Sequence, residues 1–143
     1  MGNDHLITRL MIKSHQEIDQ RLALLEKIIG RDPGLADKSF LELKNLIEKH
    51  FLIEEKAIFA FIKKLNQYDG IPNLVNQHNL MLEILNNLEN KIFSNQKLGI
   101  SKLKAIIKPH RKIEEVILYP RLDTELDESQ KKFIVEKIKK MIK

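Results

Sequence analysis

His50-Phe-Leu-Ile-Glu-Glu, residues 50–55, places a histidine and a glutamate four positions apart in a segment free of glycine and proline. Nearly the same order of residues recurs in His110-Arg-Lys-Ile-Glu-Glu, residues 110–115. Side chains at positions i and i+4 lie one above the other on an α-helix, so His50 with Glu54, and His110 with Glu114, each direct two ligand groups the same way. The two stretches predict a metal-binding His-x-x-x-Glu pair that occurs twice in the chain.

The composition indicates one folded domain. The chain has 143 residues, 43% of them hydrophobic, with 5 Gly and 4 Pro, which is typical of a single globular domain over residues 1–143. It has no apolar run of the roughly 20 residues that a membrane span requires, and the N-terminus lacks the apolar core of a signal peptide. We therefore expect a soluble, cytoplasmic protein without a membrane partner.

Two further features of the composition limit the chemistry. The chain contains no cysteine, so any metal is held by nitrogen and oxygen and not by thiolates. The formal net charge is +5, and the excess gathers near the end in Lys137, Lys139, Lys140 and Lys143. A solvated helix face explains lysines at this spacing, so a nucleic-acid partner is not expected.

Apolar residues recur at spacings of four and three in four segments, and each stripe includes a histidine. The four stripes are Met11, His15, Ile18, Leu22, Leu25 and Ile29; Leu43, Ile47, His50, Glu54, Ala57 and Phe61; Leu74, His78, Met81, Leu85, Leu88 and Ile92; and Leu103, Ile107, His110, Glu114 and Ile117. This periodicity predicts helices over about residues 4–29, 37–67, 72–93 and 100–120. A further amphipathic helix over about 127–142 should pack Phe133, Ile134, Ile138 and Met141 against the outside. The fold class is therefore all-α, an up-down-up-down four-helix bundle over about 4–122 with an additional short C-terminal helix.

Glycine, proline and capping residues predict where these helices end. Gly30 closes the first helix and Pro33-Gly34 acts as a stop signal, while Ser39 with Glu42 forms a capping box for the second. Residues 68–72 and 94–99 are expected as turn and loop.

Two prolines are expected to disturb the fourth helix. Pro109 should kink it just before His110, and Pro120 should kink or end it.

The four stripes arise from an internal repeat. Aligning His15 with His78 pairs many other residues at an offset of 63, and aligning His50 with His110 does so at an offset of 60. The pairs at these offsets include Leu22 with Leu85, Ile29 with Ile92, Glu54 with Glu114, Glu55 with Glu115, and Phe59 with Tyr119. The chain is thus two helical hairpins of similar design.

A structural role for the histidines is the alternative to metal binding. A lone histidine on an apolar face is usually a satisfied core residue, and His5 near the terminus is expected at the surface. Here, however, four of the five histidines and two glutamates fall on the stripes. Burying an unpaired carboxylate costs several kcal/mol, and a pair of divalent metal ions would remove that cost.

This ordered set of motifs resembles the hemerythrin-like or HHE domain family, whose members are non-haem di-iron four-helix bundles. The resemblance covers about residues 5–122 and rests on His15, His50-Phe-Leu-Ile-Glu-Glu, His78 and His110-Arg-Lys-Ile-Glu-Glu followed by Leu118-Tyr119-Pro120. The expected metal ligands are His15, His50, Glu54, His78, His110 and Glu114. The expected cofactor is two iron ions, Fe2+ or Fe3+, with an oxo or hydroxo bridge; manganese or zinc would also suit nitrogen and oxygen ligands.

The coordination arithmetic predicts a reactive centre. If Glu54 and Glu114 both bridge, each metal ion receives two imidazoles and two carboxylate oxygens. A first-row metal that prefers five or six ligands keeps one or two positions for solvent or a diatomic gas.

The third helix departs from the oxygen-carrying members of the family, which place a second histidine one turn from the first. The residues one turn either side of His78 are Leu74 and Leu82. The pattern of four histidines is more similar to the di-iron domain of the repair-of-iron-centres proteins, which are linked to nitric-oxide and oxidative damage of iron–sulfur clusters. Those proteins commonly carry an N-terminal segment with cysteines, which this chain lacks.

Four other polar residues near the motifs are not expected as ligands. Asp19 is interpreted as a residue that either faces solvent or contacts a metal ligand without binding the metal itself. Glu55 and Glu115 should hydrogen-bond imidazole N–H groups or form surface salt bridges. Tyr119 lies nine residues after His110, about 180° around an α-helix, so its ring is expected to pack and not to bind metal.

Three functions follow from these motifs. The first is a di-iron protein that binds or reacts with O2, NO or peroxide in sensing, stress response or detoxification. The second is an iron donor that repairs damaged iron–sulfur clusters, with an iron–sulfur protein as its partner. The third is a helical interaction module whose histidines are structural. The residues do not decide whether the protein is an enzyme.

Overall fold

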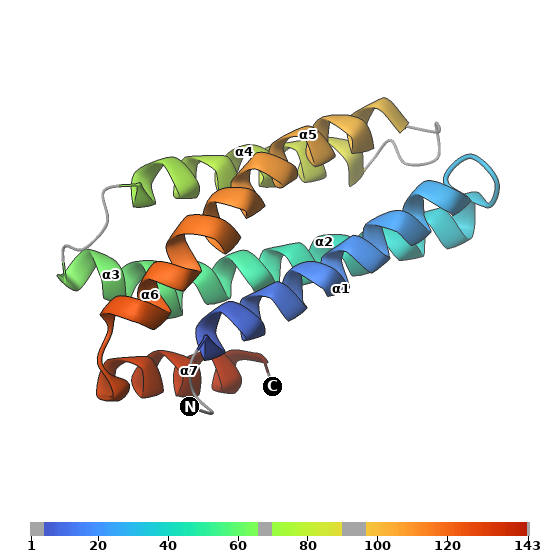
Figure 1. Ribbon diagram of the computed structural model, residues 1–143. Helices are drawn as coiled ribbons and strands as arrows, with labels where there is room; N and C mark the ends of the chain where they lie inside the picture. Colours follow the sequence, from blue (N-terminus) through green and yellow to red (C-terminus); the bar gives the residue numbers. More distant parts are fainter. Residues whose placement is uncertain (1–4, 66–69, 90–96, 143) are drawn as a thin grey trace.

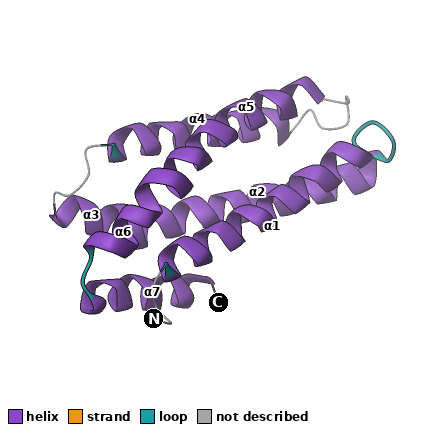
Figure 2. Ribbon diagram, viewed as in Figure 1, coloured by secondary structure: helices purple, strands orange, loops and turns teal. Residues whose placement is uncertain are grey.

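The computed structural model describes residues 5–65, 70–89 and 97–142, and these contain helices and no strand (Figure 2). The helices in chain order are α1 (Leu6–Ile28), α2 (Pro33–Ile53), the π-helical η1 (Glu54–Phe59), α3 (Ala60–Leu65), α4 (Ile71–Glu89), α5 (Lys97–Ile113), the π-helical η3 (Glu114–Leu118), α6 (Tyr119–Glu125) and α7 (Glu128–Ile142). The all-α prediction is confirmed.

Four long helical rods form the bundle (Figure 1). The rods are α1, α2 continued through η1 and α3, α4, and α5 continued through η3 and α6. Consecutive rods run in opposite directions, with α1 beside α2 and α4 beside α5, and α7 lies across the end at which α1 begins. This arrangement confirms the four-helix bundle with a C-terminal helix.

The core consists of two apolar clusters with a polar layer between them. One cluster, near α7, includes Ile7 and Met11 of α1, and the other includes Ile18 and Leu22 of the same helix. His15 lies between these pairs in the sequence, and it is 3% exposed. The layer of histidines and glutamates is therefore enclosed by apolar residues on both sides.

The start of α2 differs from the prediction. Pro33 lies in the first turn of α2, and the Asp32 carboxylate accepts a hydrogen bond from the Leu35 amide at 3.1 Å as the cap. Proline suits a first turn because its missing N–H has no partner there in any case, so Pro33-Gly34 starts a helix and does not stop one. The capping box at Ser39 is wrong, because Ser39 is buried inside α2. Gly30, with φ of 82°, leaves α1 as predicted.

The other predicted boundaries have mixed outcomes. α5 already begins at Lys97, so the predicted loop over 94–99 is too long. Gly99 is tolerated in the first turn because the N–H groups there have no helical partner to lose. The predicted helix ends at Gln67 and Phe93, and residues 68 and 69 of the predicted turn, lie outside the described residues. Ile71 and Pro72, also predicted in this turn, already belong to α4.

The two prolines of the fourth rod do not end it. Pro109 lies inside α5, and Pro120 lies in the first turn of α6, which continues to Glu125. The helix widens between them, where the Tyr119 amide donates to the Glu114 carbonyl five residues back. Because Pro120 has no N–H to donate, a π-helical turn directly before it is a compatible arrangement. Of the two predicted effects of Pro120, a kink or an end of the helix, the end is excluded because α6 continues to Glu125.

The π-helical segments also shift the buried face. Ile117, predicted on the stripe, is 50% exposed, and Leu118 is buried in its place. In the second rod Phe61 is only half-buried, whereas Ile58 and Ile62 are buried. A π-helical turn holds more residues than an α-helical turn, so the stripe moves by one residue beyond each segment.

The C-terminal helix packs through a narrower face than predicted. Ile134 and Ile138 are buried and Met141 is half-buried, but Phe133 is 54% exposed and contacts the ring of Phe61 at a centroid distance of 5.6 Å. The predicted burial of Phe133 is wrong because Val135, the residue after Ile134, is buried instead. None of the helices in the described ranges combines the length and hydropathy that a membrane span requires.

Candidate metal centre

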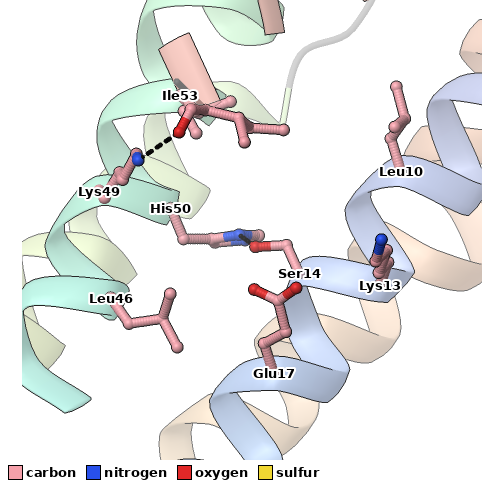
Figure 3. Close-up of a pocket in the computed structure, with 9 residues that line it drawn as sticks. Leu10, Lys13, Ser14, Glu17, Leu46, Lys49, His50 and Ile53 are labelled. Atoms are coloured by element: carbon pink, nitrogen blue, oxygen red, sulfur yellow. Dashed lines mark hydrogen bonds between the residues drawn. The ribbon is translucent and has the colours of Figure 1, made fainter. Parts of the chain in front are cut away.

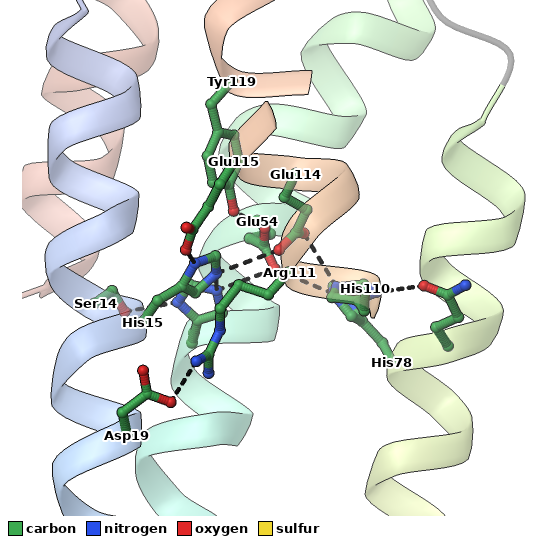
Figure 4. A network of polar contacts seen from close by, with 12 residues as sticks. Ser14, His15, Asp19, Glu54, His78, His110, Arg111, Glu114, Glu115 and Tyr119 are labelled. Carbon is green, nitrogen blue, oxygen red and sulfur yellow. Dashed lines mark hydrogen bonds and ion pairs between the residues drawn. The ribbon is translucent and has the colours of Figure 1, made fainter. Parts of the chain in front are cut away.

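The six predicted side chains meet in the middle of the bundle, and Figure 4 labels His15, Glu54, His78, His110 and Glu114 among them. α1 supplies His15, α2 supplies His50, α4 supplies His78 and α5 supplies His110. Glu54 and Glu114 are the first residues of η1 and η3, one turn beyond the histidines of their rods. The six side chains belong to residues that are 0–4% exposed, which confirms the predicted burial of all four histidines.

These side chains form two overlapping groups. His15, His50, Glu54 and Glu114 offer ligand atoms within 4.8 Å of one another, and so do Glu54, His78, His110 and Glu114. The two glutamates belong to both groups. The geometry therefore offers two neighbouring metal positions with two shared carboxylates.

Each of the four imidazoles has a hydrogen-bond partner at Nδ1, on the side of the ring away from the centre. A Glu115 oxygen lies 2.5 Å from Nδ1 of His15, and a Glu55 oxygen lies 3.0 Å from Nδ1 of His78. A carboxylate only accepts, so these two Nδ1 atoms carry the proton and both Nε2 atoms present lone pairs. Both outer glutamates thus take the role that the sequence predicted for them.

Two neutral polar residues complete the set of outer partners. The Ser14 hydroxyl lies 2.6 Å from Nδ1 of His50, and the Gln77 amide oxygen accepts from Nδ1 of His110 at 2.6 Å. Neither residue was predicted from the sequence. Each directly precedes the histidine of α1 or α4, and a polar residue at the same place in both repeats was the signal that could have found them.

The Nε2 atoms face one another in pairs. Nε2 of His15 lies 3.1 Å from Nε2 of His50, and Nε2 of His78 lies 3.2 Å from Nε2 of His110. Two imidazole ligands on one metal ion at about 2.1 Å are separated by about 3.0 to 3.4 Å for right-angled to tetrahedral geometry. Both pairs have the spacing of two ligands on one ion.

The two inner carboxylates approach these nitrogens. Oε1 of Glu54 lies 3.2 Å from Nε2 of His50 and 3.1 Å from Nε2 of His78. Glu114 uses both oxygens, with Oε1 at 3.3 Å from His15 and Oε2 at 3.1 Å from His110. Neither Glu114 oxygen receives a hydrogen bond although both are buried. Buried acceptors without a donor fit a cation better than a closed hydrogen-bond network.

Protonation of the site without metal follows from its burial. Burial lowers the pKa of His15 from 6.5 to about 2 and that of His110 to about 4, so both imidazoles are neutral, as metal ligands must be. Burial and the adjacent charge of Glu54 raise the pKa of Glu114. Burial alone would raise the pKa of Glu54, but His50 and the hydrogen bonds around the carboxylate outweigh it and hold this pKa below its usual range. A cation would be needed to keep both glutamates ionised.

The family comparison agrees with this geometry. The model of the hemerythrin HHE cation-binding domain matches residues 6–122. The chain belongs to this family. The match covers the range of the predicted resemblance, and with the two buried groups it indicates metal binding. Comparisons with curated proteins and with solved structures gave no significant match.

Asp19 does not take part in the HHE site. Its carboxylate, with 55% of the side chain exposed, pairs with the Arg111 guanidinium and belongs to neither group of ligand atoms. Of the two predicted roles for Asp19, the structure supports the one that faces solvent. His5, the fifth histidine, is exposed at the start of α1, as predicted.

Tyr119 packs in the core as predicted, but it does not point away from the centre. It is fully buried, as packing requires, but its hydroxyl donates a hydrogen bond to Oε2 of Glu54. The predicted position of Tyr119 opposite His110 follows only if every residue turns the helix by 100°. Five intervening residues form η3, whose smaller rotation per residue turns Tyr119 back toward the centre.

Two hollows border the HHE site. The first, of about 20 Å³, is lined by Ile18, Ile47, Met81, Ile107 and Arg111 together with site residues. The second, of about 170 Å³, lies between α1 and α2 and reaches Ser14 and His50 from outside, between the side chains of Lys13, Glu17 and Lys49 (Figure 3). The inner hollow adjoins the ligand atoms, whereas the outer one reaches the Nδ1 side of a single imidazole.

Proposed function

We propose that this member of the hemerythrin HHE family is a cytoplasmic non-haem di-iron protein that binds or reacts with O2, NO or peroxide in sensing, stress response or detoxification. The observation that carries the proposal is the pair of four-residue groups that share Glu54 and Glu114. A centre for one ion would need only one such group. Two groups with shared carboxylates suit two ions side by side.

The donor set favours iron. One ion would be held by the imidazoles of α1 and α2, the other by those of α4 and α5, and Glu54 and Glu114 would serve both. Nitrogen and oxygen donors suit iron, and manganese or zinc could also occupy the site. Two carboxylates leave two divalent ions with excess positive charge, which a bridging oxide or hydroxide would reduce. Bound iron would supply a redox-active Lewis acid with positions left for a small ligand.

The residues around the centre support a ligand of the size of a diatomic molecule. The hollow beside the ligand atoms measures about 20 Å³, and a cavity needs about 10 to 15 Å³ to hold one water molecule. Its walls include Ile18, Ile47, Met81 and Ile107, which exclude further water. O2, NO and peroxide match this space.

Burial supports retention of metal over its donation to an iron–sulfur protein. The six proposed ligands belong to residues that are at most 4% exposed. They also come from four separate rods, so release of an ion would require the rods to separate. We therefore favour a resident cofactor.

Metal analysis after anaerobic loading with Fe2+ tests the centre. The protein should retain about two ions per chain, and Glu54→Ala and Glu114→Ala should each lose most of the metal, because each removes a ligand from both positions. His5→Ala is the matched control, since His5 is exposed and lies outside both groups. One ion per chain, or none, would rule out a dinuclear centre.

Gas binding tests the ligand separately. The ferrous protein should show a new absorption spectrum on addition of NO and should oxidise promptly when mixed with oxygenated buffer in a stopped-flow instrument. Full occupancy by iron with no response to either gas would preserve the metal centre and reject the ligand.

A further inference from the structure

The two halves of the centre match at every ligand but differ at one buried ring. Tyr119 and Phe59 occupy equivalent places at the repeat offset of 60. The Tyr119 ring lies 5.9 Å from that of His15, and the Phe59 ring lies 5.5 Å from that of His78, centroid to centroid. Both rings are at most 2% exposed. At this pair of rings the difference between the halves is therefore one phenolic hydroxyl.

That hydroxyl coincides with a difference between the two shared glutamates. Glu54 has Oε2 occupied by the Tyr119 hydroxyl and directs Oε1 at both His50 and His78. Glu114 also lies near this hydroxyl, and its charge adds to burial in raising the pKa of Tyr119, but neither Glu114 oxygen meets the geometry of a hydrogen bond. Glu114 directs one oxygen at the imidazole on each side. One carboxylate thus approaches both metal positions with a single atom, and the other with two.

We propose that Tyr119 is a positioning residue that fixes Glu54 as a single-oxygen bridge through Oε1, while Glu114 spans the two metal positions with one oxygen each. The inference rests on the proposed dinuclear centre. A hydrogen bond from a hydroxyl to a carboxylate is strong in a buried site, and turning Oε2 toward a metal ion would leave the Tyr119 hydroxyl without a partner. Phe59 imposes no such constraint on Glu114.

With these bridges the number of ligand atoms at each metal position is unchanged, but the two bridging carboxylates are no longer equivalent. Each metal position still receives two imidazoles and two carboxylate oxygens. The asymmetry lies in the bridges, of which one is held by a protein hydroxyl and one is free to change between one-oxygen and two-oxygen binding. The free carboxylate, Glu114, is the one that could move when a small ligand enters beside it, since Glu114 lines the inner hollow.

Infrared difference spectra of the ferrous-loaded minus metal-free protein test this assignment, because the separation of the two carboxylate stretching bands depends on whether one oxygen or two bind metal. The wild-type protein should show two classes of bound carboxylate. Tyr119→Phe should convert them to one class, with Oε2 of Glu54 released. The double variant Tyr119→Phe with Phe59→Tyr should restore two classes, since the hydroxyl now holds Glu114.

The design separates the possible failures. Phe61→Tyr is the control for an added hydroxyl, because the Phe61 ring packs against Phe133, away from the centre. Thermal melts confirm that each variant folds. If the wild type does not retain two ions, the proposed function fails and the inference with it. If it does, and Tyr119→Phe leaves the carboxylate bands unchanged, only the role of Tyr119 is wrong.

Discussion

The first hairpin, with His15, His50 and Glu54, and the second, with His78, His110 and Glu114, are alike at the centre and less alike around it. The carboxylates that hold the outer side of the α1 and α4 imidazoles are Glu115 and Glu55, which are equivalent in the repeat. The other outer partners are a serine in one half and a glutamine in the other. The comparison teaches that the identity of the central side chains follows the repeat, whereas the environment of each one is set residue by residue.

Removal of metal should have the largest effect on stability, and it should destabilise both halves together. An ion that binds only the folded state at about 1,000 times its Kd stabilises that state by about 4 kcal/mol. The metal-free protein should therefore melt well below the iron-loaded protein in a thermal scan followed by circular dichroism. Equal melting temperatures would show that the interior is stable without metal.

Replacing one inner glutamate by leucine in the metal-free protein should separate the halves. Glu114→Leu removes two buried acceptors without donors and should stabilise the fold, because a buried polar group without a hydrogen bond is costly. Glu54→Leu removes the partner of the Tyr119 hydroxyl, and an unpaired buried hydroxyl costs about 1 to 3 kcal/mol.

Chemical denaturation of the two variants measures this difference. Glu114→Leu should be the more stable variant. In the background of Tyr119→Phe the difference in unfolding free energy between the two variants should shrink, because Glu54→Leu then leaves no hydroxyl without a partner. An unchanged difference would show that the Tyr119 hydroxyl is not its cause.

Substitution of the outer carboxylates should affect metal affinity to a similar degree in the two halves. Glu55→Gln and Glu115→Gln each weaken the partner that orients an imidazole, and loss of such a partner lowers metal affinity by about 10- to 100-fold. Competition with a coloured chelator should give similar losses for both variants. A large effect in one half alone would mean that the two metal positions are not equivalent in their supports.

Ser14→Ala should have the smallest effect. The pocket between α1 and α2 reaches Ser14 and His50, so a water molecule could take the place of the hydroxyl at Nδ1. We expect a loss of affinity below that of Glu115→Gln in the same chelator assay. A loss as large as that of the carboxylate variant would show that water does not reach the imidazole.

Most of the ligand geometry was predictable from local sequence. His50 with Glu54, and His110 with Glu114, are one turn apart on a helix, and this relation does not depend on how the rods pack. The stripe also predicted burial of His15 and His78, because a histidine at a core spacing is carried into the core with its neighbours. The start of α2 was missed since Pro33-Gly34 suits both the end of one helix and the first turn of the next.

The amino-acid sequence by itself determined the helical bundle, the repeat and the six side chains at its centre, because each follows from spacing along a single helix. Only the tertiary structure decided which outer residue holds which imidazole, since His15 meets Glu115 and His78 meets Glu55 across different rods. It also decided that the Tyr119 hydroxyl reaches Glu54. The π-helical turns that rotate Tyr119 inward depend on packing around the two glutamates, and an α-helical period cannot anticipate them.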